Sequence, residues 1–289
     1  RISPCPYLCL YPCLYPCLYP CLFENFRTMN GLSFQLYSAR DHGPWTAVFE
    51  RIAALGYTGV EGYAALYDDP EALARELAAF SLAMPTAHLA VEALEDEPER
   101  AFATARTLGV TTIFAPYLAP DARPSTLDDW RAFAARLRRI GERVNGEGFG
   151  FGWHNHDFEL VPLADGTVPL EILFGEAPDL EWEADLAWLV RAGADPLDWI
   201  ARHGARITAV HLKDLAPAGE AVDEGGWADV GHGTMDWPSL IGALRAHPAP
   251  KHWIVEHDEP SDLDRFASRA MASWRGWTGG DDRGAGARA

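Results

Sequence analysis

The amino-acid sequence predicts an α/β protein, a (β/α)8 TIM barrel, on three observations. Eight short β-rich runs alternate with eight longer amphipathic stretches, the pattern of parallel strands joined by crossover helices. A count of eight favours closure, because a closed barrel leaves no sheet edge exposed. The alternative, an open doubly wound sheet, lacks support, because no GxGxxG follows the first run and no Walker-type loop occurs.

The expected strands and helices follow one another in regular order. The β-rich runs are 32–38, 58–64, 83–90, 111–117, 149–156, 180–188, 207–214 and 252–259. The helical patterns are 44–56, 69–80, 97–109, 125–148, 168–177, 195–204, 236–248 and 261–277.

Capping residues support these boundaries. Asp69 and Asp195 each precede a proline, which is N-cap chemistry, and Gly56 and Gly109 suit left-handed C-caps. The one long insertion, 216–235, follows the seventh run and is expected at the barrel face where active sites form.

The two ends of the chain differ from the rest. Residues 1–28 repeat Tyr-Pro-Cys-Leu and contain all five cysteines. A proline at every fourth position is incompatible with a helical signal sequence or membrane span. We interpret 1–28 as a low-complexity, non-native or disordered extension, 29–277 as a single barrel domain, and the Gly-rich 278–289 as a disordered tail.

Composition limits the partners and the compartment. The formal net charge is −18, which argues against nucleic acid and anionic membranes, because both require clustered Lys and Arg. Without a credible signal sequence, the cytoplasm is the expected location. Exposed barrel helices are compatible with a homo-oligomer, although no pattern locates an interface.

Strands five to eight each end in two ionisable side chains. Because alternate residues of a strand point to the same side, the members of each couple share a face. Burying such charges costs several kcal/mol each unless they are paired or bind a cation. Mixed imidazole and carboxylate ligands favour Mn²⁺, Co²⁺, Zn²⁺ or Fe²⁺, and a structural ion-pair network is the alternative. The couples are His154 and His156, Glu183 and Asp185, His211 and Lys213, and Glu256 and Asp258.

Three residues are assigned to substrate binding, one of them already named in a couple. His88 ends the third run, where it either contacts substrate or is a hydrogen-bonded core residue. Trp153 either stacks on a sugar ring or packs in the core, and Glu183 completes the group. Apart from Lys213, no basic residue clusters near the strand ends, so a phosphorylated substrate has little support.

Several segments together resemble the sugar phosphate isomerase/epimerase proteins of the xylose-isomerase-like TIM barrel superfamily. They are QLYSARD, GWHNHDFEL, the run DLAWLVRAGADPLDWIARHGARITAVHLKDL, VGHGTMDWPSL and WIVEHDEP, between about residues 32 and 275. The set is specific, although each piece alone is not. The HNH on strand five is similar to inosose dehydratases and keto-sugar enzymes.

The resemblance implies a divalent metal held by one residue from each of strands five to eight. Three ligands would be Asp185, His211 and Glu256, and the fourth would be His154 or Glu159. Ketose epimerases of the superfamily have a glutamate where this chain has His154, which puts their two-glutamate mechanism in doubt.

Catalytic roles follow from the chemistry that such a site permits. We assign Glu256 as base and ligand, Glu159 or His156 as the second acid/base, and Lys213 as the electrostatic stabiliser of an enediolate. The expected function is a metal-dependent sugar isomerase or epimerase acting on a ketose, aldose or keto-sugar. The alternatives are an inosose dehydratase or 3-keto-sugar lyase, and a non-catalytic sugar-binding barrel.

Overall fold

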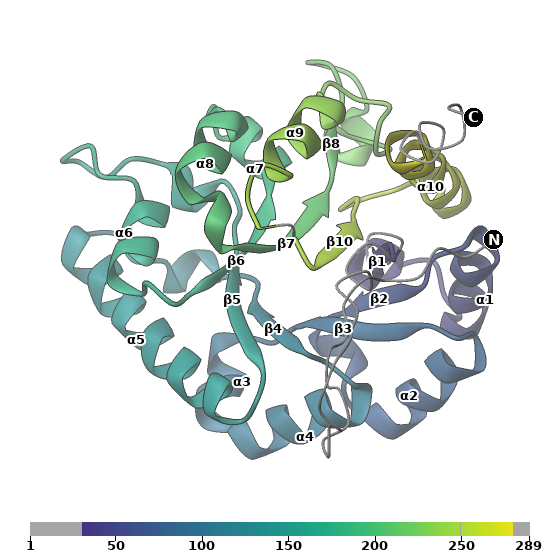
Figure 1. The fold of residues 1–289 in the computed structure, drawn as a ribbon, viewed down its shortest axis with the longest axis horizontal. Helices are drawn as coiled ribbons and strands as arrows, with labels where there is room; N and C mark the ends of the chain where they lie inside the picture. Colours follow the sequence, from purple (N-terminus) through teal and green to yellow (C-terminus); the bar gives the residue numbers. More distant parts are fainter. Residues whose placement is uncertain (1–30, 249, 280–289) are drawn as a thin grey trace, which may run out of the picture. The chain divides into compact units, whose positions relative to one another are not determined.

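The structure, a computed structural model, describes residues 31–248 and 250–279 (Figure 1). Eight parallel strands close into a barrel in the order β1-β10-β7-β6-β5-β4-β3-β2, which confirms the predicted fold class. The expectations for residues 1–28 and for most of the C-terminal tail lie outside the described residues. The barrel strands are β1 (Ser33–Gln35), β2 (Gly59–Gly62), β3 (Ala83–His88), β4 (Thr112–Ala115), β5 (Gly150–His154), β6 (Glu181–Asp185), β7 (Ile207–Leu212) and β10 (His252–Val255).

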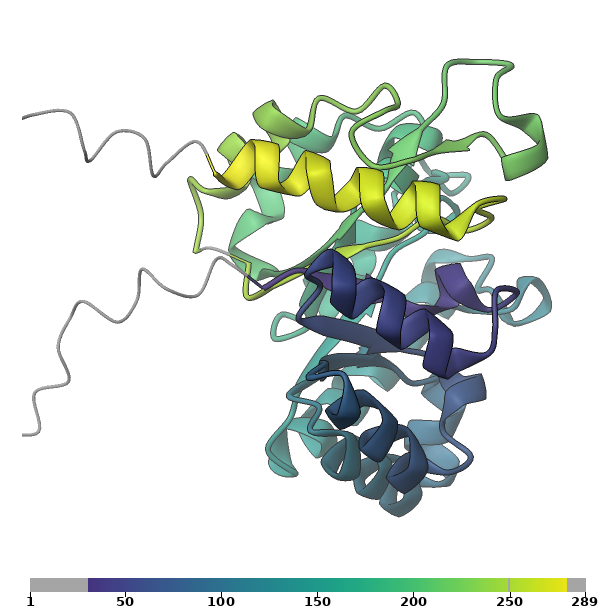
Figure 2. The ribbon, with the colours of Figure 1, turned by 90° about the vertical axis from the view of Figure 1, so that its right-hand side faces the viewer.

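Helices surround the barrel. Figure 2 shows α1 and α10, which contact each other, side by side on its outside. In the part of the chain that the structure describes, no helix is long and apolar enough to cross a membrane. The helices are α1 (Trp45–Leu55), α2 (Pro70–Ala79), α3 (Val91–Asp96), α4 (Pro98–Leu108), α5 (Leu127–Gly146), α6 (Pro169–Glu176), α7 (Leu186–Arg191), α8 (Pro196–His203), α9 (Trp237–Leu244) and α10 (Leu263–Thr278).

The capping predictions are confirmed. The Asp69 and Asp195 side chains accept the backbone N–H groups of Ala72 and Leu197, at 2.9 Å each. Gly56 ends α1 with a φ of 99°, a left-handed conformation that other residues rarely adopt. Gly109 ends α4 in the same way.

Three short elements depart from the expected order. Helix α3 precedes α4 where no separate helix was expected. Run 180–188 is a strand only to Asp185, because the Asp185 carboxylate caps the N–H groups of Ala187 and Trp188 and starts α7. Within the insertion 216–235, β9 (Trp227–Ala228) pairs antiparallel with β8 (Asp214–Leu215), which lies just before the insertion.

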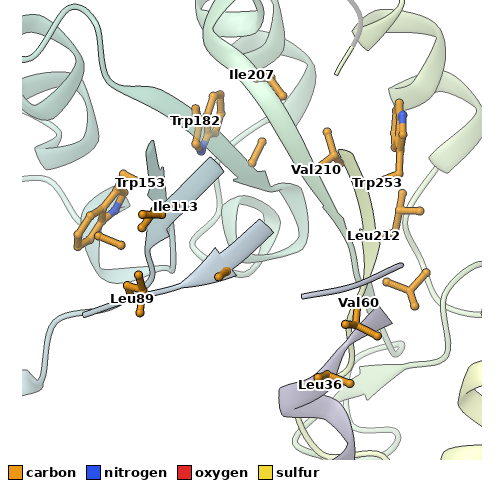
Figure 3. Packing of buried hydrophobic residues seen from close by; sticks show 14 of the residues in the cluster. Leu36, Val60, Leu89, Ile113, Trp153, Trp182, Ile207, Val210, Leu212 and Trp253 are labelled. Atoms are coloured by element: carbon orange, nitrogen blue, oxygen red, sulfur yellow. The ribbon is translucent and has the colours of Figure 1, made fainter. Parts of the chain in front are cut away.

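The main apolar core lies between the strands and the helices, and Trp153, Trp182 and Trp253 belong to it (Figure 3). A second, small cluster consists of Phe114, Ala209 and Ile254. Gly152 makes room for Phe114, since a Cβ at this position would lie 2.5 Å from the Phe114 ring.

Candidate active site

Polar side chains gather where the barrel strands end. The strand alternation inferred from the sequence accounts for this, because Trp153 and Trp182 pack outward while their neighbours on the chain meet inside. All of these polar residues are buried, and an unpaired charge is unfavourable in a buried environment. They are Gln35, Glu61, His88, His154, Glu183, Asp185, His211, Lys213 and Glu256.

One group of four could hold a cation and is called here the ligand set: His154, Asp185, His211 and Glu256. Each offers one ligand atom, and these atoms all lie within 4.8 Å of one another. His211 Nδ1 is 2.8 Å from Glu256 Oε2. Asp185 Oδ1 accepts two backbone N–H groups, whereas its Oδ2 is buried without a hydrogen bond. A buried carboxylate oxygen without a hydrogen bond, beside imidazole nitrogens, fits a divalent transition metal, although the Lys213 ammonium also lies 3.3 Å from this oxygen.

A second group, called here the inner set, consists of Glu61, His88 and Glu183. Glu183 lies two residues before Asp185 on β6, so its side chain is on the same face of the strand and deeper in the barrel. His88 Nε2 lies 2.6 Å from Glu183 Oε2 and 3.1 Å from Glu61 Oε2. With His154 and His211, His88 and Glu183 form another group that could hold an ion.

Lys213 joins the ligand set to the cavity rim. Its side chain is 1% exposed, and Nζ lies 2.9 Å from Glu256, 2.8 Å from Asp258 and 3.3 Å from Asp185. The indole of Trp227, on hairpin strand β9, lies 4.6 Å from the same nitrogen. Three carboxylates and an aromatic face therefore keep a buried ammonium charged.

The pKa values follow from burial and from these neighbours. Burial alone would lower the pKa of His88, but Glu61 and Glu183 raise it to about 10. Burial raises the pKa of Asp185 to about 6 although Lys213 opposes it. The pKa of Glu256 is held well below its usual value because Lys213 and His211 outweigh its burial. The positive charge near Asp185 is therefore not enough to offset the cost of burying its ionised carboxylate.

Asn155 and His156 follow β5 directly, and their side chains point in different directions. His156 lines the cavity between Tyr117 and Trp188, and burial together with Lys213 lowers its pKa to about 3. It is therefore a neutral imidazole at physiological pH. Asn155 points the other way, accepts the Trp182 indole N–H at 2.8 Å and fixes the start of α7 through the Asp185 backbone.

The structure separates Glu159 and Trp153 from the cavity. Glu159 Oε1 accepts the Trp153 indole N–H at 2.8 Å, and Oε2 accepts the His156 backbone N–H at 2.9 Å. Trp153 is buried against Phe133 of α5. Of the two ligands left open by the sequence, His154 lies in the group of four and Glu159 does not. Burial raises the pKa of Glu159 to about 8.

A cavity of about 560 Å³ opens above these residues. Trp188 lines it together with four of the ten predicted site residues, which are His88, His154, His156 and Glu256.

Arg40 and Arg123 also line the cavity, which corrects the expectation that Lys213 is the only basic group near the strand ends. Both come from loops after strands, where strand periodicity no longer applies. Arg40 donates to the backbone oxygen of Tyr37 at 3.0 Å, and Arg123 donates to the hydroxyl of Tyr117 at 2.9 Å.

Sequence reasoning also missed Glu61 and Gln35. Glu61 is the single polar residue of β2, and neither residue has a second charged residue or histidine two positions away. Their positions on adjacent strands, paired in register, could have been a signal only once the barrel order was known.

Comparison with known proteins agrees with this fold. A family model described as xylose isomerase-like TIM barrel matches residues 49–275. Among curated proteins, the rhizopine catabolism protein MocC of Rhizobium meliloti is 28% identical over 144 residues. That match covers 46% of this chain and 43% of MocC, so it spans less than half of the relative's length.

Solved structures show the same architecture. A sugar phosphate isomerase/epimerase from Parabacteroides distasonis superposes with a TM-score of 0.70 at 20% identity, covering 85% of this chain and 94% of that one. The probable 3-DHS dehydratase AsbF of Bacillus anthracis gives 0.67 at 16% identity, covering 84% and 97%. The IOLI protein with a bound zinc atom gives 0.66 at 16% identity, covering 86% and 96%. At these identities the likeness shows the fold.

Proposed function

Because the chain belongs to the xylose isomerase-like TIM barrel family, we propose that it is a divalent-cation-dependent sugar isomerase or epimerase. The observation that carries this proposal is the ligand set, four residues from four consecutive barrel strands that meet beside a cavity. The zinc in the IOLI structure, which has the same fold, adds support.

We propose that His154, Asp185, His211 and Glu256 hold the cation, which can be Mn²⁺, Co²⁺, Zn²⁺ or Fe²⁺. When bound, such a cation supplies Lewis acidity toward a carbonyl oxygen and its neighbouring hydroxyl. The Oδ2 of Asp185, which accepts no hydrogen bond and has the Lys213 ammonium 3.3 Å away, and the raised pKa of this carboxyl favour further positive charge at this point.

Glu256 is the proposed base. Its low pKa keeps it ionised, and its position on the cavity wall allows it to take a proton from the carbon beside the carbonyl. Lys213, 2.9 Å from Glu256, places a fixed positive charge where an enediolate develops negative charge. Isomerisation and epimerisation then differ in the carbon or face to which the proton returns.

His156 is the proposed second acid/base. Its imidazole lines the cavity, its Nδ1 is buried without a hydrogen-bond partner, and Glu159 fixes its backbone. Glu159 thus acts through His156 and not directly on substrate. His88 and Glu183 support the base of the pocket, with His88 the one that reaches the cavity.

The cavity charges favour an unphosphorylated sugar or keto-sugar. Two arginines line the cavity together with four carboxylates, so its balance is negative. The carboxylates are Asp157, Glu256, Asp258 and Glu259.

A dehydratase or lyase is the second candidate, because removal of the same proton can expel a β-hydroxyl instead. The proton taken by Glu256 would then leave with the β-hydroxyl as water, so the step balances without a second acid. The likeness to the AsbF dehydratase structure supports this candidate at the level of the fold.

The experiment is a cation assay on the whole chain, with His211→Ala as the test and the exposed His232→Ala as the matched control. We expect about one transition metal per chain in the wild type and in H232A, and loss of it in H211A. A wild-type protein that cannot be loaded with Mn²⁺, Co²⁺ or Zn²⁺ would contradict the proposal.

A sugar and keto-sugar screen in D₂O then separates the candidates. Exchange of carbon-bound hydrogen supports enolisation, and release of water identifies a dehydratase. Glu256→Gln should slow exchange by about 10²–10⁴-fold. Sugar binding without any exchange would identify a non-catalytic binding barrel.

A further inference from the structure

The two ring nitrogens of His211 face two different carboxylates. Nδ1 is 2.8 Å from Glu256 Oε2 in the ligand set, and Nε2 is 2.8 Å from Glu61 Oε2 in the inner set. His211 and Glu61 are both fully buried. Each ring nitrogen therefore has a different carboxylate as its nearest partner.

The hydrogen-bond direction at Glu61 is settled by Gln35. The Gln35 Oε1 atom accepts the backbone N–H of Tyr37 at 3.0 Å, so its amide nitrogen is the atom that faces Glu61. That nitrogen donates to Glu61 Oε2 at 2.7 Å. Glu61 Oε2 is therefore an acceptor, and His211 Nε2 must carry the proton of their shared hydrogen bond.

Metal-binding histidines commonly donate their second N–H to a carboxylate, which fixes the tautomer and the ring orientation. We propose that Glu61 is a positioning residue that holds His211 with Nε2 protonated and Nδ1 directed at the cation. This inference rests on the proposed function, because it assumes that the ligand set binds a cation. Gln35 in turn holds Glu61.

The competing interpretation is a second cation bound by His88, His154, Glu183 and His211. That group would require His211 to bind through Nε2, since this nitrogen lies 3.4 Å from Glu183 Oε2. The same nitrogen is already within 2.8 Å of Glu61, and one imidazole nitrogen cannot both donate a proton and bind a metal. The geometry therefore favours one cation above a supporting layer.

The first test needs no variant. Nitrogen-15 histidine spectra of the whole chain loaded with Zn²⁺, with His211 assigned by comparison with H211A, should show His211 coordinated through Nδ1 and protonated at Nε2. Coordination through Nε2, or two Zn²⁺ ions per chain, would overturn the proposal.

The second test compares cation affinity by chelator competition in Glu61→Ala and Glu61→Gln. We expect E61A to lose about 10–100-fold in affinity, the usual effect of removing such a partner. E61Q should recover part of this loss, because its carbonyl oxygen can still accept from His211. Equal affinity in wild type and E61A would contradict the proposal, whereas failure of the wild type to bind would contradict the proposed function instead.

Glu181→Ala is the matched control. Glu181 lies on β6, two residues before Glu183. Its carboxylate accepts a hydrogen bond from the Thr208 hydroxyl at 2.7 Å and does not contact the ligand set. It should leave cation affinity unchanged. Thermal unfolding of all three variants identifies loss of folding, in which case the Zn²⁺ spectra of the wild type decide the question.

Discussion

Two networks of carboxylates and cations differ in how completely they are paired. One connects the β8–β9 hairpin region to the start of α10. There, Glu224 accepts from Ser261 and from Arg265, and Asp229 accepts from Arg265 and Arg269. The Arg265 side chain is 30% exposed. Burial of Glu224 would raise its pKa, but the hydrogen bonds that it accepts from Arg265 and Ser261 lower this pKa to about 2.

The other network surrounds Lys213 at the barrel end. It is more deeply buried, and carboxylate oxygens at this barrel end lack hydrogen bonds, among them Asp185 Oδ2, 3.3 Å from Lys213 Nζ, and Glu183 Oε1 of the adjoining inner set. Burial raises the pKa values of Asp185 and Asp258 despite the neighbouring ammonium. A network that only stabilised the fold would resemble the first, so the incomplete hydrogen bonding of these buried carboxylates points to a ligand-binding role.

Lys213→Met should have the largest effect on stability. It leaves Asp185, Glu256 and Asp258 buried without their shared cation, which we expect to cost about 3–5 kcal/mol of unfolding free energy. Urea unfolding measures this loss. Arg269→Met, which removes a half-exposed partner of Asp229, is the control and should cost about 1 kcal/mol or less.

Added divalent cation should restore part of the lost stability in K213M, because it binds the folded state alone. If K213M loses no more unfolding free energy than R269M, the two networks contribute equally to stability.

Glu224→Gln should have an intermediate effect that depends on pH. The folded pKa of Glu224, about 2, lies below its ordinary value of 4.5, so the ionised carboxylate stabilises the fold above about pH 4.5. This contribution is lost as the pH falls from about 4.5 to about 2. We expect wild type to exceed E224Q by about 1–2 kcal/mol at pH 7 and the gap to close in acid. A gap that stays constant from pH 7 to pH 3 would argue against an ionised Glu224.

Trp227→Phe should have the smallest effect. The Trp227 ring lies 3.5 Å from the Arg191 guanidinium carbon and 4.6 Å from Lys213 Nζ. Phenylalanine keeps an aromatic face of weaker attraction, so we expect a loss of about 0.5–1 kcal/mol in urea unfolding. If turnover of an identified substrate falls although W227F stays folded under the assay conditions, the hairpin also sets the position of Lys213.

Strand periodicity predicted much of the site. Alternation placed His154, Glu183, His211 and Glu256 on the inner face, and the structure brings all four together. It failed beyond the strand ends, because loop backbones have no fixed period. Glu159 turns back to Trp153, and Arg40 enters the cavity from a loop that carries no pattern.

The sequence by itself determined the barrel, since the number and alternation of its β-rich and amphipathic segments allow few other ways to bury their apolar faces. It also determined which face each polar residue of a strand occupies. The tertiary structure alone decided that Glu61 on β2 meets His211 on β7, 150 positions along the chain. Such a pair depends on barrel closure and on the relative depth of the strands, which no local pattern in the sequence encodes.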